Sequence, residues 1–151
     1  MNDSLSPTTM SQHNIAEAQQ SIADEFALFS DWSERYQYLI DLGKQLTSLP
    51  KECQTDQYRV EGCQSMVWLV SDGDAHCMQF MAGSNSLIVS GLLSLLLRVY
   101  SNRTAADIIA TEPAFIHASG LAKHLSPTRS NGFAMTLAKL KDYARAAVDS
   151  E

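Results

Sequence analysis

The chain has 151 residues, of which 45% are apolar and 19% charged, so it fits one folded domain better than a disordered chain. Its formal net charge of −6 argues against nucleic-acid binding, which needs clustered Lys and Arg side chains. The most apolar stretch, Leu87 to Tyr100, is shorter than the roughly 20 residues that span a membrane. The N-terminus resembles no secretory signal, and we therefore expect a cytoplasmic protein.

The N-terminal part of the chain predicts a tail followed by two helices. Residues 1–13 are rich in Ser, Thr, Gln and Asn and predict a disordered tail, which leaves a single domain over residues 14–151. Apolar residues recur at three- and four-residue spacing from Ile15 to Phe29, as in an amphipathic helix. Asp31 predicts the N-cap of a second helix, which ends before Pro50.

The middle of the chain predicts strands. Three short β-prone segments lie at residues 58–60, 66–70 and 77–81. Between the second and third segments, the Asp72-Gly73 pair predicts a tight hairpin turn. We therefore expect a three-stranded antiparallel meander.

The C-terminal half predicts helices again. The stretch from Ser86 to Tyr100 is apolar nearly all round and predicts a buried central helix. Thr104 and Pro113 each predict the start of a short helix, and Ser126-Pro127 predicts the N-cap and first residue of the last one. The predicted fold class is α+β, with a small three-stranded antiparallel sheet packed against several helices.

Three cysteines are the main chemical candidates. An odd number without zinc-finger spacing predicts neither a disulfide framework nor a structural zinc site. Cys63 follows Gly62 in a predicted turn, where its thiol can be presented to another molecule and turn amides can stabilise the thiolate; the alternative is a buried, inert thiol. We expect Cys77, in an apolar strand, to lie in the core, and Cys53, in a polar loop, to lie at the surface.

Arg129 is the second candidate. It falls in the first turn of the predicted last helix, where a cation opposes the helix dipole. An arginine at this place is explained by an anion or a carboxylate on a partner, or it is an ordinary solvated side chain.

One segment carries a family resemblance. Glu61-Gly62-Cys63-Gln64-Ser65-Met66-Val67-Trp68 resembles the active-site segment of the SufE/CsdE family of sulfur acceptors, and is closer to SufE than to CsdE. The similarity continues in three further stretches, Trp32 to Leu46, Ile88 to Leu93 and His124 to Ser130.

The resemblance implies a carrier of persulfide sulfur in iron–sulfur cluster assembly. Such a protein takes sulfur from a pyridoxal-phosphate-dependent cysteine desulfurase (SufS- or CsdA-like) onto Cys63, stimulates that enzyme, and passes the sulfur to a SufBCD-like scaffold complex. It also implies a monomer or weak homodimer that has no enzymatic turnover and holds no metal or cofactor. By resemblance, the residues that assist Cys63 are Gly62, Gln64, Ser65, Arg129 and His124.

Two other functions are weighed against this one. An iron–sulfur scaffold of the IscU type shares the fold and uses three cysteines, but here the cysteines crowd into the predicted meander. A cysteine hydrolase would pair Cys63 with a histidine brought close by the fold. It would turn over an ester or amide without a protein partner.

Overall fold

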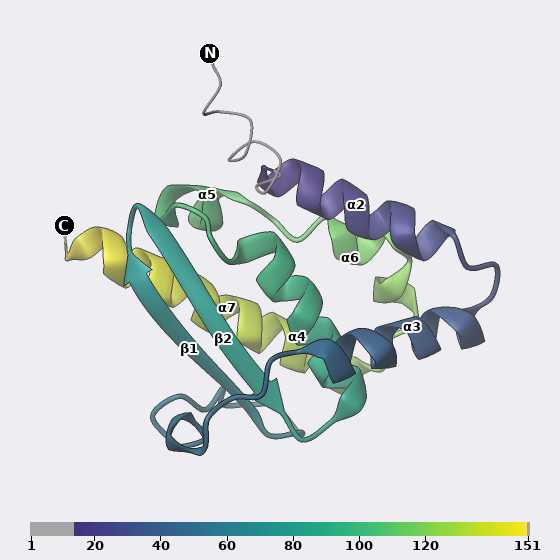
Figure 1. The fold of residues 1–151 in the computed structure, drawn as a ribbon, viewed down its shortest axis with the longest axis horizontal. Helices are drawn as coiled ribbons and strands as arrows, with labels where there is room; N and C mark the ends of the chain where they lie inside the picture. Colours follow the sequence, from purple (N-terminus) through teal and green to yellow (C-terminus); the bar gives the residue numbers. More distant parts are fainter. Residues whose placement is uncertain (1–13, 151) are drawn as a thin grey trace, which may run out of the picture.

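The computed structural model describes residues 14–150, so the predicted tail lies outside the described residues. A two-stranded antiparallel sheet, β1 (Val67–Asp74) and β2 (Cys77–Ser84), lies against helices on one side (Figure 1). The helical elements are α2 (Ile15–Ala27), α3 (Trp32–Gln45), η1 (Lys51–Cys53), α4 (Leu87–Tyr100), α5 (Ala105–Ala110), α6 (Phe115–Ala118), η2 (Leu121–Lys123) and α7 (Pro127–Asp149).

Local capping chemistry sets the start of the predicted helices. At each of four N-caps, a side-chain oxygen accepts a hydrogen bond from the backbone N–H three residues later, which satisfies an amide that the helix leaves unpaired. The caps are Asp31 for α3, Ser86 for α4, Thr104 for α5 and Ser126 for α7. The α+β class and the helix starts at these caps are confirmed.

The predicted third strand is wrong. Residues 58–60 approach β1 through two backbone hydrogen bonds, from the Val60 amide to the Val67 carbonyl and from the Leu69 amide to the Tyr58 carbonyl. This contact stays an isolated bridge because hydrogen-bonded turns precede it and Gly62, at φ 87°, turns the chain away after it. A β-prone tripeptide between two turns is too short to extend the ladder.

The hairpin turn lies further along the chain than predicted. Asp74 pairs with Cys77 at the end of the ladder, so Ala75 and His76 form the turn, and Asp72-Gly73 belongs to β1. The carboxylate of Asp74 accepts hydrogen bonds from the His76 amide at 2.9 Å and the Cys77 amide at 3.3 Å. This Asx-type capping favours the turn at Asp74.

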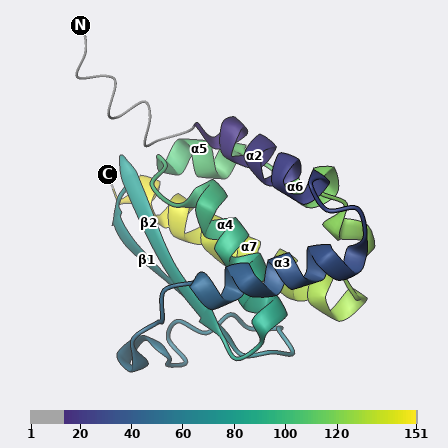
Figure 2. The same ribbon diagram turned by 45° about the vertical axis from the view of Figure 1, so that its right-hand side comes forward.

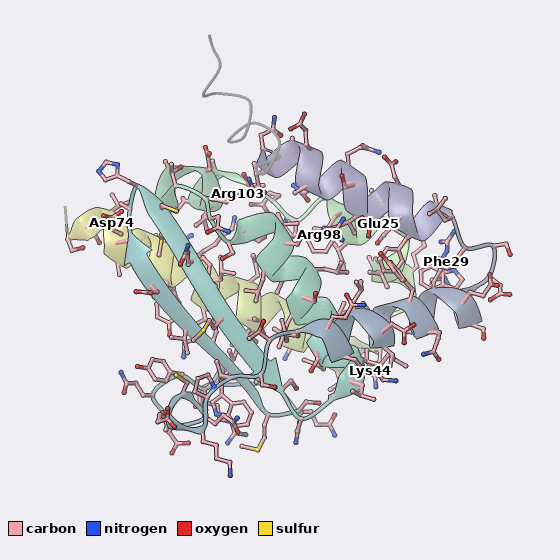
Figure 3. All side chains as sticks on the ribbon, viewed as in Figure 1. Glu25, Phe29, Lys44, Asp74, Arg98 and Arg103 are labelled. Atoms are coloured by element: carbon pink, nitrogen blue, oxygen red, sulfur yellow. The ribbon has the colours of Figure 1, made fainter. Side chains whose placement is uncertain are left out.

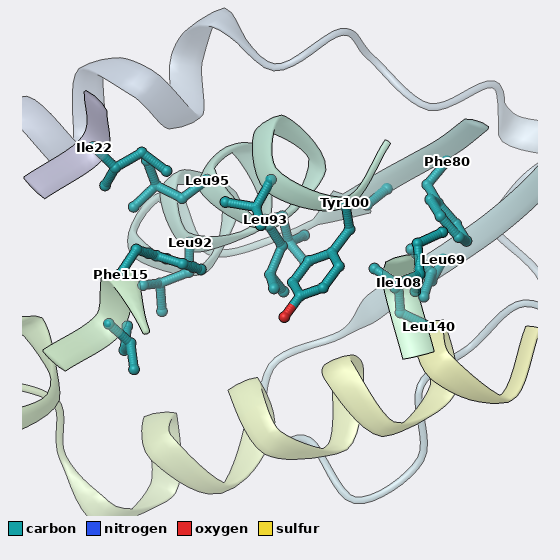
Figure 4. Close-up of a cluster of buried hydrophobic side chains, with 14 of the residues drawn as sticks. Ile22, Leu69, Phe80, Leu92, Leu93, Leu95, Tyr100, Ile108, Phe115 and Leu140 are labelled. Atoms are coloured by element: carbon teal, nitrogen blue, oxygen red, sulfur yellow. The ribbon is translucent and has the colours of Figure 1, made fainter. Parts of the chain in front are cut away.

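Helix α4 forms the centre of the molecule and contacts α2, α3, α7 and β2 (Figure 2). It buries Leu92, Leu93, Leu95 and Tyr100, confirming the predicted central helix. Figure 4 shows these side chains meeting buried ones from the sheet and from α2, α5, α6 and α7. No helix within residues 14–150 is long and apolar enough to cross a membrane.

Helices α3 and α4 meet through glycines. A Cβ atom on Gly91 would lie 2.2 Å from the carbonyl oxygen of Leu39, and one on Gly43 would lie 2.6 Å from the carbonyl oxygen of Leu87. Real Cβ contacts are never this short, so the spacing of the two helices depends on the missing side chains. This contact holds α4 in the position from which its other face reaches the functional site.

An ion pair joins α2 to α4 (Figure 3). Arg98 donates to both carboxylate oxygens of Glu25, and the hydroxyl of Tyr38 on α3 donates to the same carboxylate. The hydrogen bond from Arg98 is the main reason that the pKa of Glu25 is lowered. The network ties three helices together away from the cysteine loop.

Candidate functional site

Cys63 lies in the loop that leads into β1, and two side chains of α7 hold that loop. The Nδ2 of Asn131 donates to the carbonyl oxygen of Gly62 at 3.3 Å. Met135 packs against the same glycine, where an added Cβ would meet its Cε at 3.3 Å. Gly62 has φ 87°, a conformation that favours glycine. The loop is therefore fixed on the first turns of α7, with Cys63 facing the helix.

The sulfur of Cys63 contacts the backbone of α7 directly. Its thiol donates to the carbonyl oxygen of Gly132 at 3.6 Å. A Cβ on Gly132 would lie 3.5 Å from that sulfur, so glycine leaves open the space next to the thiol. The side chain of Cys63 is half-buried, which makes it neither a core thiol nor a freely exposed one.

A cavity of about 430 Å³ opens at Cys63, between its loop, α4 and the start of α7. Its wall on α4 is entirely aliphatic, and Val67 and Phe133 extend the apolar surface. The polar residues around it are Gln64, Ser65, Ser126, Thr128, Arg129 and Thr136. The thiol thus faces a space with apolar side chains on one side and hydrogen-bonding groups on the other.

Burial in this environment raises the pKa of the Cys63 thiol. Two smaller influences oppose burial: a hydrogen bond from the side chain of Thr136 and the positive charge of Arg59. The apolar surroundings disfavour a charged sulfur and so favour the protonated thiol of Cys63. A reaction at this sulfur therefore needs a way to stabilise the thiolate.

The structure brings together most of the residues predicted around Cys63. Gln64, Ser65 and Arg129 line the same cavity as the thiol, and Gly62 shapes its loop. Arg129 lies in the first turn of α7, as predicted, and its side chain is exposed. Within residues 14–150 its guanidinium forms no ion pair, so it is available to an anion at the cavity.

His124 lies elsewhere. It does not line the cavity; its ring stacks on Trp32 with a centroid separation of 3.6 Å. Its carbonyl oxygen accepts a hydrogen bond from the hydroxyl of Tyr36. These contacts with α3 fix the segment that leads into Ser126 and α7.

Sequence reasoning missed three residues on α7: Asn131, Gly132 and Thr136. Thr136 is 3% exposed, and its hydroxyl donates to the Gly132 carbonyl at 2.8 Å. Spacing could have revealed part of this, because residues 132, 136 and 140 share a helix face and Leu140 is apolar. The pattern shows which face is buried but not that Cys63 lies on it.

The other two cysteines are remote from this arrangement. Cys77 is exposed beside the hairpin turn, so its predicted place in the core is wrong: the strand alternates, and Met78 and Phe80 point inward instead. Cys63 precedes the opposite end of β1, a strand whose eight residues extend over roughly 25 Å. Cys53 is half-buried at the end of η1. Within residues 14–150, no three His, Cys, Asp or Glu side chains form a metal site.

Comparison with known proteins identifies the family that the chain matches and several similar proteins. Residues 20–144 match the family model described as "SufE: Fe-S metabolism associated domain". An uncharacterized SufE-like protein of Rhizobium meliloti is 37% identical over 82% of this chain and 91% of its own length. The sulfur acceptor protein CsdE of Escherichia coli is 36% identical over 75% of this chain and 78% of its own length.

A solved structure supports the fold independently. The solution structure of a hypothetical protein from Thermus thermophilus superimposes with a TM-score of 0.70, covering 89% of this chain and 96% of that one. The two sequences are 18% identical, so this likeness concerns the arrangement of helices and strands alone.

Proposed function

The chain belongs to the SufE family, and from this premise we propose that it is a sulfur acceptor of iron–sulfur metabolism that carries sulfur as a persulfide on Cys63. The observation that carries the proposal is the half-buried thiol of Cys63 at the mouth of a cavity of about 430 Å³ with an aliphatic wall. A thiol buried only for packing would be surrounded by close contacts instead of open space.

The proposed transfer is a thiol–persulfide exchange. The thiolate of Cys63 attacks the terminal sulfur of a persulfide on a cysteine desulfurase. A new S–S bond forms on Cys63 while the S–S bond of the donor breaks, and the desulfurase cysteine leaves as a thiolate. The thiol proton of Cys63 passes to solvent or to a base of the partner. No electron acceptor is needed, and the pyridoxal phosphate that generates the donor persulfide belongs to the desulfurase.

The cavity suits the product of this exchange. A persulfide exposed to solvent is open to reduction by small thiols and to oxidation. The aliphatic side chains of α4 keep water from one side of the sulfur, and Gly132 leaves room beside it. We propose that this shelter lets the chain move between its partners in the cytoplasm without losing sulfur.

The partners form the finer part of the proposal. The chain would stimulate a SufS- or CsdA-like desulfurase by removing sulfur from it, and would then pass the sulfur to a SufBCD-like scaffold. The exposed guanidinium of Arg129, next to the cavity, suits a carboxylate or persulfide anion of the docked desulfurase. The chain itself would have no turnover.

The two alternative functions fit the geometry less well. A scaffold of the IscU type needs its cysteines around one cluster, whereas Cys63 and Cys77 flank opposite ends of the hairpin. A cysteine hydrolase needs a histidine at the thiol, and among residues 14–150 none lines the cavity at Cys63.

Desulfurase kinetics test the proposed function. Cysteine desulfurase activity is measured with and without the chain, as alanine formed from cysteine in the absence of added reductant. We expect stimulation by the wild-type chain and by Cys77→Ser, the matched control, and none by Cys63→Ser. Equal stimulation by Cys63→Ser would contradict the proposal.

A further inference from the structure

Three hydrogen-bond donors surround the carbonyl oxygen of Gly132. Its backbone position in α7 gives it the N–H of Thr136 as the ordinary helical partner. The hydroxyl of Thr136 donates to it at 2.8 Å, and the thiol of Cys63 donates to it at 3.6 Å. A carbonyl oxygen has two lone pairs, so one of the three donors is dispensable.

The hydroxyl of Thr136 is the donor that can turn away. This hydroxyl and the Cys63 thiol donate to the same carbonyl oxygen, and both side chains line the same cavity. Rotation about the C–O bond of Thr136 moves only the hydrogen. The side chain is 3% exposed, so water does not compete for it. Gly132 would keep its helical hydrogen bond after the rotation.

We propose that Thr136 stabilises the reacting thiolate of Cys63, its hydroxyl turning from the carbonyl of Gly132 to the sulfur when the thiol loses its proton. In the resting state the thiol donates to Gly132. After deprotonation the sulfur can only accept, and the hydroxyl of Thr136 supplies the donor. Both protonation states therefore have a hydrogen-bond partner.

Other side chains with polar hydrogens line the cavity, but those of Gln64, Ser126 and Thr128 are exposed and that of Ser65 is half-buried. The wall on α4 consists of Val89 and leucines, which have no polar hydrogen on their side chains. Among the charged side chains of residues 14–150, Arg59, ahead of the loop, lowers the pKa of the thiol, and Arg129 lines the cavity. Arg129 is exposed to solvent, which screens its charge. Thr136 is the buried donor among them.

The inference deepens the proposed function, because attack on a persulfide needs the thiolate of Cys63. Its test does not depend on any sulfur donor. In a background with Cys53→Ser and Cys77→Ser, the rate of alkylation by iodoacetamide is measured against pH, and its midpoint reports the pKa of Cys63. Thr136→Val removes the hydroxyl at nearly constant volume, and Thr136→Ser keeps it.

We expect Thr136→Val to raise the midpoint by about one pH unit, the effect of losing one hydrogen bond to a charged group. Thr136→Ser should keep the wild-type midpoint. If Thr136→Val does not fold, as judged by thermal melting, Thr136→Ala takes its place in the comparison with Thr136→Ser. An unchanged midpoint without the hydroxyl, or an equal rise in Thr136→Ser, would overturn the inference.

Sulfur loading separates this inference from the proposed function. If the chain accepts persulfide sulfur, Thr136→Val should load about tenfold more slowly than Thr136→Ser at neutral pH, in line with the smaller thiolate fraction. A shifted midpoint in a chain that accepts no sulfur would support the role of Thr136 and contradict the proposed function. If the chain accepts sulfur but Thr136→Val leaves the alkylation midpoint unshifted, the proposed function is supported and the role of Thr136 is contradicted.

Discussion

The sulfur of Cys63 lies 3.6 Å from the carbonyl oxygen of Gly132, a residue 69 positions later in the chain. The contact joins the loop before β1 to α7, and the missing Cβ of Gly132 leaves open space beside the thiol. The start of α7 is therefore one wall of the candidate functional site. It supplies Gly132 and Thr136 at the sulfur and Arg129 next to the cavity.

Arg129 tests whether the polar residues around the cavity serve sulfur transfer. Its side chain is exposed and unpaired within residues 14–150, so Arg129→Ala should change the melting temperature little. We expect desulfurase stimulation to fall severalfold, because an anion at the cavity loses its charged partner. Arg145→Ala, near the other end of the same helix, is the matched control and should stimulate normally. Normal stimulation by Arg129→Ala would leave Arg129 an ordinary surface side chain.

Gly91 tests the packing that positions α4. A Cβ at this residue would lie 2.2 Å from the carbonyl oxygen of Leu39, so Gly91→Ala must push α3 and α4 apart. We expect a loss of about 2–3 kcal/mol in the free energy of unfolding, measured by urea denaturation. Gly132→Ala is the control, because its methyl group would meet the Cys63 sulfur only at an ordinary 3.5 Å. Equal stability of the two variants would show that the helices do not depend on Gly91.

The Glu25–Arg98 ion pair predicts a pH dependence of stability. Because Arg98 lowers the pKa of Glu25 in the folded chain, the pair stabilises the fold above the unfolded carboxyl pKa and stops doing so as pH falls through the lowered value. Both side chains are about one-third exposed, which limits the effect to about 1 kcal/mol at neutral pH. Glu25→Gln should therefore unfold at lower urea concentration than wild type at neutral pH and at the same concentration in acid.

The exposed pair of Asp142 and Arg145 serves as the comparison for Glu25. Both of its side chains are mostly solvated, so Asp142→Asn should leave the urea midpoint unchanged across the same pH range. A difference between wild type and Glu25→Gln that persisted undiminished in acid would show that the pair acts through packing and not through its charge.

Local chemistry made the helices predictable, and its limits explain the errors in the sheet. Asp31 and Ser126 cap their helices through bonds that span three residues, so the sequence pattern contains all the information needed. The hairpin turn depends on a choice between Asp72-Gly73 and Asp74, both of which carry turn chemistry. The prediction of a third strand was wrong because residues 58–60 form only an isolated β-bridge with β1 and lie between two turns.

The site was predictable only in part, for a related reason. The presentation of Cys63 follows from Gly62 beside it, a local signal. The contact of the sulfur with Gly132 crosses about half of the chain, and no local pattern encodes it. The exposure of Cys77 was mispredicted because an apolar segment does not reveal which of its alternating residues face the core.

The intact mass of the chain after incubation with a cysteine desulfurase and cysteine tests the central claim most directly. The account predicts a gain of one sulfur atom, removed by a thiol reductant, located by peptide mapping on Cys63 and absent from Cys63→Ser. Cys53→Ser and Cys77→Ser should gain the same mass as wild type. An added sulfur on Cys53 or Cys77, or one that persists in Cys63→Ser, would contradict the account.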